Sequence, residues 1–232
     1  NNRKLGIAAT KGQGKTFLIK AKRIQTQNSE VICFPINDMV DTLDSSMKIN
    51  RSLDKLLVNY YEWVTLWKIS IAVTIIASYE FKNVFEEKDF CRLKSETRTL
   101  LNLPNEKRRP SIILAYLLGL EYFELGPILE DASLIIHLLD KINSGVYLFI
   151  DKVDQAFSIY VYKENIKSKA RNASYWQYCQ YGLANAAYEL FSNINSHIKV
   201  FYTIRHEALI DSEWLAQNTA RNIESFITEL IY

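Results

Sequence analysis

The sequence has few of the features that mark specialised protein classes. It contains only three cysteines and no C-x-x-C pair. That excludes a disulfide framework and gives no support to a cysteine-rich metal site, and it suits a reducing, cytoplasmic setting. The longest apolar region, residues 69–79, is too short to span a bilayer. No signal peptide, internal repeat or low-complexity tract is present, so the sequence predicts a cytoplasmic protein without a membrane partner.

Excess charge of one sign is also missing, because 28 Lys and Arg residues face 26 Asp and Glu residues. This balance argues neither for nor against a nucleic-acid partner. With 48% hydrophobic and 23% charged residues, the chain can bury a sizeable core, and 232 residues suit one large domain. The chain starts with Asn rather than Met and ends in what resembles an unfinished strand. We therefore expect residues 1–232 to be one domain of a longer protein.

The most informative stretch is residues 9–17, which read A-T-K-G-Q-G-K-T-F. Its second half has the chemistry of a phosphate-binding P-loop, G-x-x-x-x-G-K-[ST], with Ala9 in place of the first glycine. An apolar run precedes it and a helical composition follows it, as a P-loop requires. Lys15 is expected to reach the β- and γ-phosphates of ATP, and the Thr16 hydroxyl to ligate Mg²⁺. The predicted nucleotide-binding residues are Thr10, Lys11, Gly12, Gln13, Gly14, Lys15, Thr16 and Phe17.

A second informative stretch, residues 145–154, is an apolar run that ends in Asp-Lys-Val-Asp. Parallel α/β sheets place ligand chemistry at the carboxyl ends of their strands, so Asp151 is the predicted Walker B acid and second magnesium ligand. Lys152 stands where many ATPases carry the acid that orients the attacking water. Asp154 is the nearest residue that could replace that acid. It could equally well be an N-cap or first-turn acid of a helix, which the helix dipole favours.

The remaining segments predict alternating strands and helices. Strands are expected at 30–36, 197–205 and 225–232, and helices at 53–75, 112–123, 128–142, 176–192 and 214–222, with a break at Gly126-Pro127. Trp63 and Trp67 are expected to pack in the core. His137 lies between apolar residues and is expected to be a packed core histidine, because no metal-binding partner lies at the right spacing. The basic run 107–109 predicts a solvated turn, with phosphate or DNA contact as the alternative.

The G-K-T loop, the strand ending at Asp151 and the strand ending Thr-Ile-Arg at 203–205 together resemble the additional-strand P-loop ATPases. This branch contains AAA+ proteins, STAND switches and KAP-type ATPases. The resemblance implies a sensor role for Thr203 and matches Arg205 to the arginine that STAND proteins carry at a T-[ST]-R strand end, with Ile204 in place of the middle hydroxyl residue. It assigns no arginine finger: Arg221 lies roughly where AAA+ rings place one, but a surface arginine is the default interpretation. It also implies a three-layer αβα P-loop NTPase domain with a parallel sheet of order 5-1-4-3-2. The strands would lie near residues 4, 31, 147, 200 and 227, with a helical insertion at about 51–143 after the second strand.

The sequence leaves three functions open. The first is a magnesium-dependent ATPase module of a larger assembly, and the Asp-x-x-Asp and I-R-H-E-A runs resemble ATPases of bacterial antiviral defence systems, including the RADAR type. Its catalytic residues would be Asp151, Asp154, Thr203 and Arg205, and its partners ATP or ADP, further copies in a ring and an effector protein. The second is a nucleotide-binding switch with negligible turnover, which Lys152 favours. The third is a DNA-loading or DNA-translocating ATPase.

Overall fold

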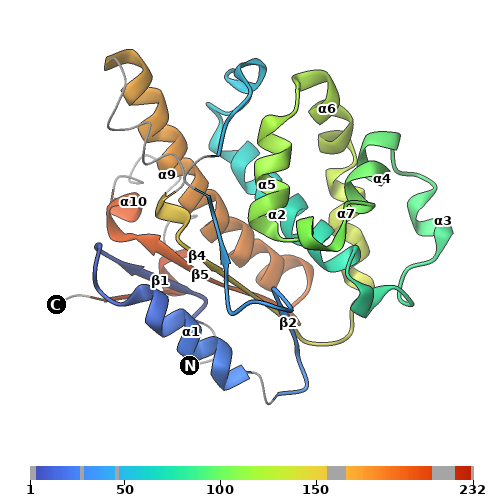
Figure 1. Ribbon diagram of the computed structural model, residues 1–232, viewed down its shortest axis with the longest axis horizontal. Helices are drawn as coiled ribbons and strands as arrows, with labels where there is room; N and C mark the ends of the chain where they lie inside the picture. Colours follow the sequence, from blue (N-terminus) through green and yellow to red (C-terminus); the bar gives the residue numbers. More distant parts are fainter. Residues whose placement is uncertain (1–3, 27–28, 45–46, 156–165, 211–222, 231–232) are drawn as a thin grey trace.

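The computed structural model describes residues 4–26, 29–44, 47–155, 166–210 and 223–230, which form an α/β domain with a parallel six-stranded sheet (Figure 1). The order along the sheet is β2-β4-β5-β1-β6, and β3 pairs with β4. The strands are β1 Gly6–Ala9, β2 Ile32–Phe34, β3 Asp41–Thr42, β4 Val146–Asp151, β5 Ile198–Arg205 and β6 Ile227–Glu229. The predicted α/β class with a parallel sheet is confirmed. Five strands lie in the expected regions, whereas the short β3 was not predicted.

The two central strands, β4 and β5, are apolar because helices cover both faces of the sheet. On one face Phe149 of β4 stacks on Phe201 of β5, with ring centroids 5.1 Å apart. Helix α1 (Lys15–Thr26) covers this face, and its Arg23 lies 5.3 Å from the centroid of the Phe149 ring. Successive strand residues point to opposite faces, so Tyr202 points away from α1. Helix α9 (Ile166–Glu189) packs against β5 there, an arrangement compatible with a three-layer α/β domain.

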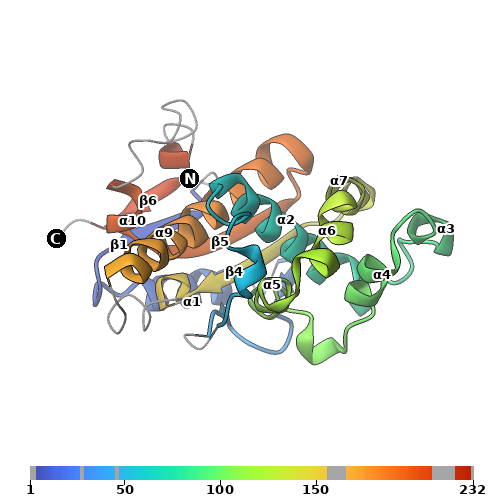
Figure 2. The same cartoon turned by 90° about the horizontal axis from the view of Figure 1, so that it is seen from above.

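A mostly helical segment lies between β3 and β4, in the range where a helical insertion was predicted after the second strand. Figures 1 and 2 both show α3, α4, α6 and α7 at the end of the molecule far from β1. The elements are η1 Arg51–Leu53, α2 Tyr60–Ile76, η2 Tyr79–Phe81, α3 Glu87–Phe90, α4 Ser95–Leu101, η3 Asn105–Lys107, α5 Pro110–Gly119, α6 Tyr122–Glu130, α7 Ala132–Leu138 and η4 Leu139–Lys141.

Helix α2 joins this segment to the sheet domain. Trp63 and Trp67 are both fully buried, so their predicted core role is confirmed. The Trp63 indole N–H donates to the Leu57 carbonyl at 3.0 Å, and that of Trp67 donates to the Cys179 carbonyl of α9 at 2.8 Å. Each large ring therefore buries its apolar surface without leaving its N–H unpaired. α2 and α9 pack closely because Gly182 leaves no side chain between them.

Two local predictions were wrong. The helix break lies at 120–121 rather than at Gly126-Pro127, because a capping box at Glu121 starts α6 at Tyr122. The Glu121 N–H donates to the Glu124 carboxylate at 2.9 Å. Pro127 sits inside α6, where it loses only its own donor, since its carbonyl still accepts from the Asp131 N–H at 3.2 Å. His137 is not a core residue: its side chain is 83% exposed and contacts Asp140 at 2.9 Å. It lies on the face of α7 opposite the buried Ala132 and Ile135.

The remaining elements are short. A π-helical turn, Leu190–Ile194, follows α9, and helix α10 (His206–Ile210) and the 3₁₀ turn η5 (Val153–Gln155) follow β5 and β4 respectively. The helix expected at 214–222, which includes Arg221, lies outside the described residues. None of the helices in the described part of the chain combines the length and apolar character needed to cross a membrane.

Candidate functional site

The predicted phosphate loop connects β1 to α1, as the motif requires. Gly12 and Gly14 have φ angles of +92° and +76°, a left-handed conformation that L side chains rarely adopt. The Thr10 N–H donates to Gln13 Oε1 at 2.9 Å, which closes the turn, and the Leu18 N–H donates to the Gly14 carbonyl at 3.1 Å. The glycines thus give the loop its sharp path into the N-terminus of α1.

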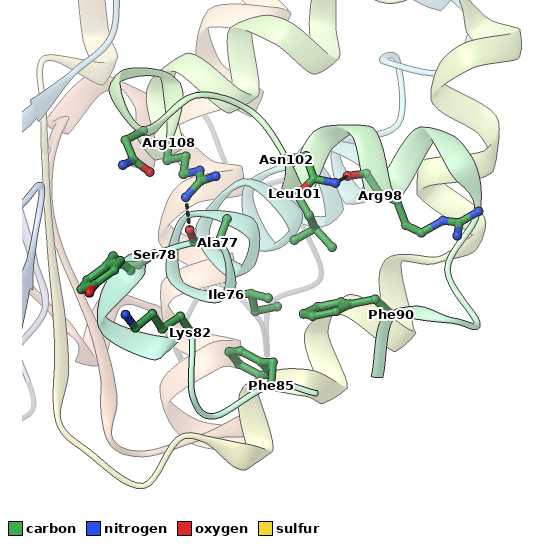
Figure 3. A pocket seen from close by; sticks show the side chains of 12 residues that line it. Ile76, Ala77, Ser78, Lys82, Phe85, Phe90, Arg98, Leu101, Asn102 and Arg108 are labelled. Carbon is green, nitrogen blue, oxygen red and sulfur yellow. Dashed lines mark hydrogen bonds between the residues drawn. The ribbon is translucent and has the colours of Figure 1, made fainter. Parts of the chain in front are cut away.

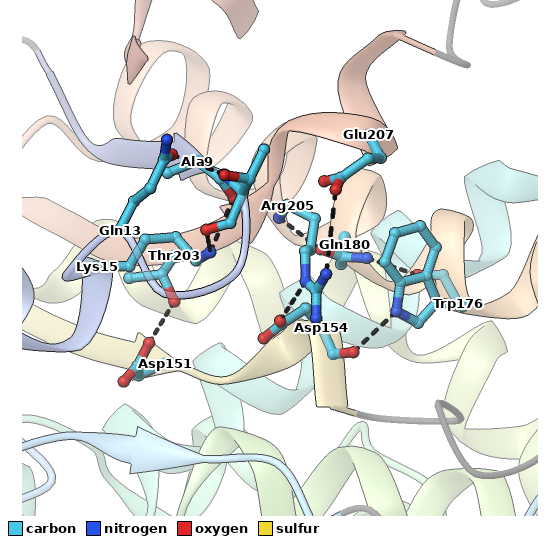
Figure 4. A network of polar contacts seen from close by, with 11 residues as sticks. Ala9, Gln13, Lys15, Asp151, Asp154, Trp176, Gln180, Thr203, Arg205 and Glu207 are labelled. Carbon is cyan, nitrogen blue, oxygen red and sulfur yellow. Dashed lines mark hydrogen bonds and ion pairs between the residues drawn. The ribbon is translucent and has the colours of Figure 1, made fainter. Parts of the chain in front are cut away.

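Lys15, the first residue of α1, folds back over this loop (Figure 4). Its Nζ donates to the carbonyl oxygens of Ala9, at 2.8 Å, and Thr10, at 2.9 Å. Burial lowers the pKa of the Lys15 ammonium, and the Asp154 carboxylate nearby partly opposes that effect. The partners of this ammonium are neutral carbonyls, so a phosphate in the loop would offer it a stronger, charge-assisted hydrogen bond.

Asp151 and Thr203 meet at the carboxyl ends of the neighbouring strands β4 and β5. The Thr203 hydroxyl donates to Asp151 Oδ1, and the two residues are 0% and 1% exposed respectively. The other carboxylate oxygen, Asp151 Oδ2, is buried without a hydrogen-bond partner among the described residues. A buried carboxylate oxygen left in this state costs free energy unless a cation or a donor satisfies it. Oxygen ligands of this kind suit Mg²⁺, so the residues present fit the predicted ion.

A second group of contacts holds Asp154 and Arg205 beside this site. The Arg205 Nε donates to Asp154 Oδ2 at 2.6 Å, and the Trp176 indole N–H donates to the Asp154 carbonyl at 2.8 Å. Gln180 accepts the Arg205 backbone N–H at 2.8 Å. Glu207 lies at 4.0 Å from Arg205 Nη1. Asp154 is therefore neither a free carboxylate nor a simple helix cap: it forms a partly buried ion pair with Arg205 (Figure 4).

The structure thus brings the predicted Lys15, Asp151, Asp154, Thr203 and Arg205 together. It adds Trp176, Gln180 and Glu207, which sequence reasoning missed. A sequence signal existed for Gln180 only, a glutamine within an otherwise apolar helix face. Thr16 lies in the first turn of α1, partly buried, whereas Lys11 is exposed and Phe17 is 74% exposed.

The basic run 107–109 and the predicted magnesium site were the two other functional features of the sequence. In the basic run, Arg108 donates to backbone carbonyls of Ala77 and Leu103, and Arg109 pairs with Asp38. Two of its three charges are therefore engaged within the molecule. Across the described ranges no group of three or more His, Cys, Asp or Glu side chains is arranged to hold a metal ion. A magnesium ion would accordingly depend on Thr16, Asp151 and phosphate oxygens.

Comparison with known proteins adds no relative to this description. No protein-family model matches the chain, and no curated protein or solved structure matches it either. The function is therefore argued from the geometry of the site.

Proposed function

We propose that this chain binds Mg-ATP at the carboxyl ends of β1, β4 and β5 and hydrolyses it to drive or switch a larger cytoplasmic assembly. One observation carries the proposal. The loop with left-handed Gly12 and Gly14 and the back-folded Lys15 follows β1, and Asp151, whose Oδ2 has no hydrogen-bond partner among the described residues, ends β4. Only β5 lies between these two strands of the sheet. A loop for phosphate and a buried oxygen for a cation are the two parts that such chemistry needs.

The residues divide the work as follows. Backbone N–H groups at 12–16 and the positive end of the α1 dipole receive phosphate oxygens, and Lys15 exchanges the Ala9 and Thr10 carbonyls for them. Thr16 and Asp151 would hold the cation. The Thr203 hydroxyl fixes Asp151 through Oδ1, and Oδ2 has no hydrogen-bond partner among the described residues. When bound, Mg²⁺ neutralises charge on the phosphate groups. Arg205 supplies a further positive charge close to the same strand ends.

The order of the strands supports a finer class. β5, which carries Thr203, lies between β1 and β4. In the expected order 5-1-4-3-2, which counts only five strands, β5 is the fourth strand, and it is likewise expected between the first strand (β1) and the third (β4). This supports the three-layer domain of the additional-strand AAA+/STAND/KAP-like branch. The ring of further copies, the effector partner and the role in bacterial antiviral defence rest on the resemblance of the sequence runs alone.

A second candidate function is a nucleotide-binding switch with negligible turnover. Lys152 replaces the usual catalytic acid, and Asp154, its nearest substitute, is bound to Arg205. A carboxylate engaged in an ion pair is a poor base, because its negative charge is already stabilised. A DNA-loading function has less support, since Arg109 of the basic run is already paired with Asp38.

Nucleotide binding is tested with a fluorescent ATP analogue titrated with and without Mg²⁺. Lys15→Ala should weaken binding by about a hundredfold, as expected for a lost charge-assisted contact to phosphate. Asp151→Asn should keep the contact from Thr203 but abolish the gain in affinity that Mg²⁺ provides. Lys20→Ala removes an exposed lysine of the same helix and should bind as the wild type does. Wild-type affinity in both Lys15→Ala and Asp151→Asn would overturn the proposal.

Steady-state phosphate release then separates the two functions. Under the first, the wild-type chain turns over ATP faster than both Lys15→Ala and Asp154→Ala. Under the second, the wild type binds ATP with Mg²⁺ dependence but releases phosphate no faster than Asp154→Ala.

A further inference from the structure

A cavity of about 420 Å³ lies in the helical segment, away from the phosphate loop (Figure 3). It is a partly open pocket lined by residues at the C-terminal end of α2, the turn η2, α3, α4 and the turn η3. Four apolar side chains converge on its centre: Ile76, Phe85, Phe90 and Leu101. Ile76, Phe85 and Leu101 are each less than a tenth exposed. The floor of the cavity is therefore built from packed apolar side chains.

The rim of the same cavity is positively charged. Lys82, Arg98 and Arg108 line it, and none of its lining residues is acidic. The Arg108 guanidinium is held in place by two neutral acceptors, the carbonyls of Leu103, at 2.6 Å, and Ala77. The Lys82 ammonium lies 3.7 Å from the centroid of the Tyr79 ring.

These charges lack carboxylate partners. In the part of the chain that the structure describes, no Asp or Glu lies within ion-pair distance of Lys82, Arg98 or Arg108. Arg108 uses two of its five N–H donors on carbonyls, so donors remain for an anion. A fixed guanidinium beside an apolar floor is suited to carboxylate or phosphate, because both the charge and the apolar surface are already in place.

We propose that this cavity binds a small amphipathic anion, with its apolar body on Ile76, Phe85, Phe90 and Leu101 and its carboxylate or phosphate head group at Lys82 and Arg108. The apolar body gains by leaving water, and the head group gains by meeting uncompensated positive charge. A neutral ligand of the same shape gains only the first of these.

An adjacent cavity of about 490 Å³ provides a contrast within the same segment. It shares Ser78, Tyr79, Asn105 and Arg108 with the first cavity, but Glu80 and Glu106 also line it. These carboxylates bring negative charge to the lining of the second cavity, whereas no acidic residue lines the first, so the preference for an anion belongs to the first cavity.

The test uses 8-anilinonaphthalene-1-sulfonate, an aromatic anion of the proposed class, as a fluorescent probe of the full chain. We expect saturable binding at one site per chain. Decanoate, decyl phosphate and decanol carry similar straight apolar chains and differ in their head groups. Each is then added to compete with the bound probe for the cavity. Displacement by decanoate or by decyl phosphate, but not by decanol, supports the proposal, and the stronger of the two competitors identifies the head group. Displacement by decanol as effective as by the two anions would overturn the proposal.

Charge reversal tests the rim directly. Lys82→Glu should weaken binding of the probe by about tenfold, the effect expected for loss of one charged contact. Arg98→Glu provides a second variant at another exposed position of the rim. Lys55→Glu makes the same change at an exposed lysine that lines neither cavity and should leave binding unchanged. Equal binding by Lys82→Glu, Arg98→Glu and Lys55→Glu would show that the rim selects no anion.

Discussion

Asp41 offers a prediction about stability whose size can be worked out from the structure. This residue of β3 is 1% exposed. Its carboxylate accepts hydrogen bonds from the first turn of helix α5, 70 positions further along the chain. The Ser111 N–H donates to Asp41 Oδ2 at 2.8 Å, and the Ser111 hydroxyl donates to Oδ1 at 2.5 Å. Thr42, the next residue, pairs with Asp151 in the sheet. Asp41 therefore ties the helical segment to the strand that carries the predicted magnesium ligand.

Burial raises the pKa of Asp41 from 3.8 to about 6, against the opposing effect of the hydrogen bonds from Ser111. The folded state thus favours the protonated carboxyl. The stability that this protonated carboxyl contributes is complete below its unfolded pKa of 3.8 and is lost as the pH rises through its folded pKa of about 6. The total change is about 3 kcal/mol, and roughly half of it falls between pH 5 and pH 8. Asp41→Asn keeps an acceptor and a donor for Ser111 but does not titrate.

Urea unfolding followed by tryptophan fluorescence at pH 5, 6, 7 and 8 measures this effect. The free energy of unfolding of Asp41→Asn relative to the wild type should rise by about 1.5 kcal/mol from pH 5 to pH 8. Asp89→Asn is the matched control. The hydrogen bond from Lys141 lowers the pKa of Asp89, so this carboxylate is ionised in both states over that range. Parallel pH curves for wild type and Asp41→Asn would refute the argument.

Three further substitutions test parts of the fold and the loop. Gly14→Ala places a side chain at φ +76° and should cost about 1–2 kcal/mol of backbone strain, measured as weaker binding of the ATP analogue. Gly182→Ala puts a Cβ atom 2.9 Å from the Trp63 Cβ at the α2–α9 contact and should destabilise the protein by about 1–3 kcal/mol in urea. Trp67→Phe removes the donor to the Cys179 carbonyl and should cost about 1–3 kcal/mol in the same assay.

Local patterns in the sequence were sufficient for five of the six strands and for the path of the glycine-rich loop between β1 and α1. The apolar runs of β4 and β5 reflect burial on both faces of the sheet. The left-handed residues of the loop are glycines. Each feature therefore depends on residues that are adjacent in the sequence. β3 was missed because it is two residues long and forms only through pairing with β4. Its Asp41 is a polar residue buried by distant elements, which no local pattern indicates.

The same distinction applies to the site. Lys15 and Asp151 belong to recognisable runs, so their types and positions predict their chemistry. The contact between Asp154 and Arg205 joins residues 51 positions apart. Gln180 and Trp176 reach this pair from α9, whose packing follows from the whole domain rather than from its own sequence. Side-chain partners of this kind depend on tertiary structure, so residue patterns alone could list the candidates but not pair them.

The backbone at Lys152, the residue after Asp151, explains why Asp154 pairs with Arg205. Lys152 has φ +59°, so the chain leaves the direction of β4 immediately after the predicted magnesium ligand. The Gln155 N–H then donates to the Lys152 carbonyl at 2.9 Å, which closes the 3₁₀ turn η5. This turn carries Asp154 to Arg205 of the neighbouring strand. A substitution at 152 alone, such as Lys152→Glu, would therefore restore an acid to the sequence while leaving Asp154 bound to Arg205. Turnover in that variant should remain close to the wild-type value, and a large increase in phosphate release would show that the side chain at 152 does reach the nucleotide.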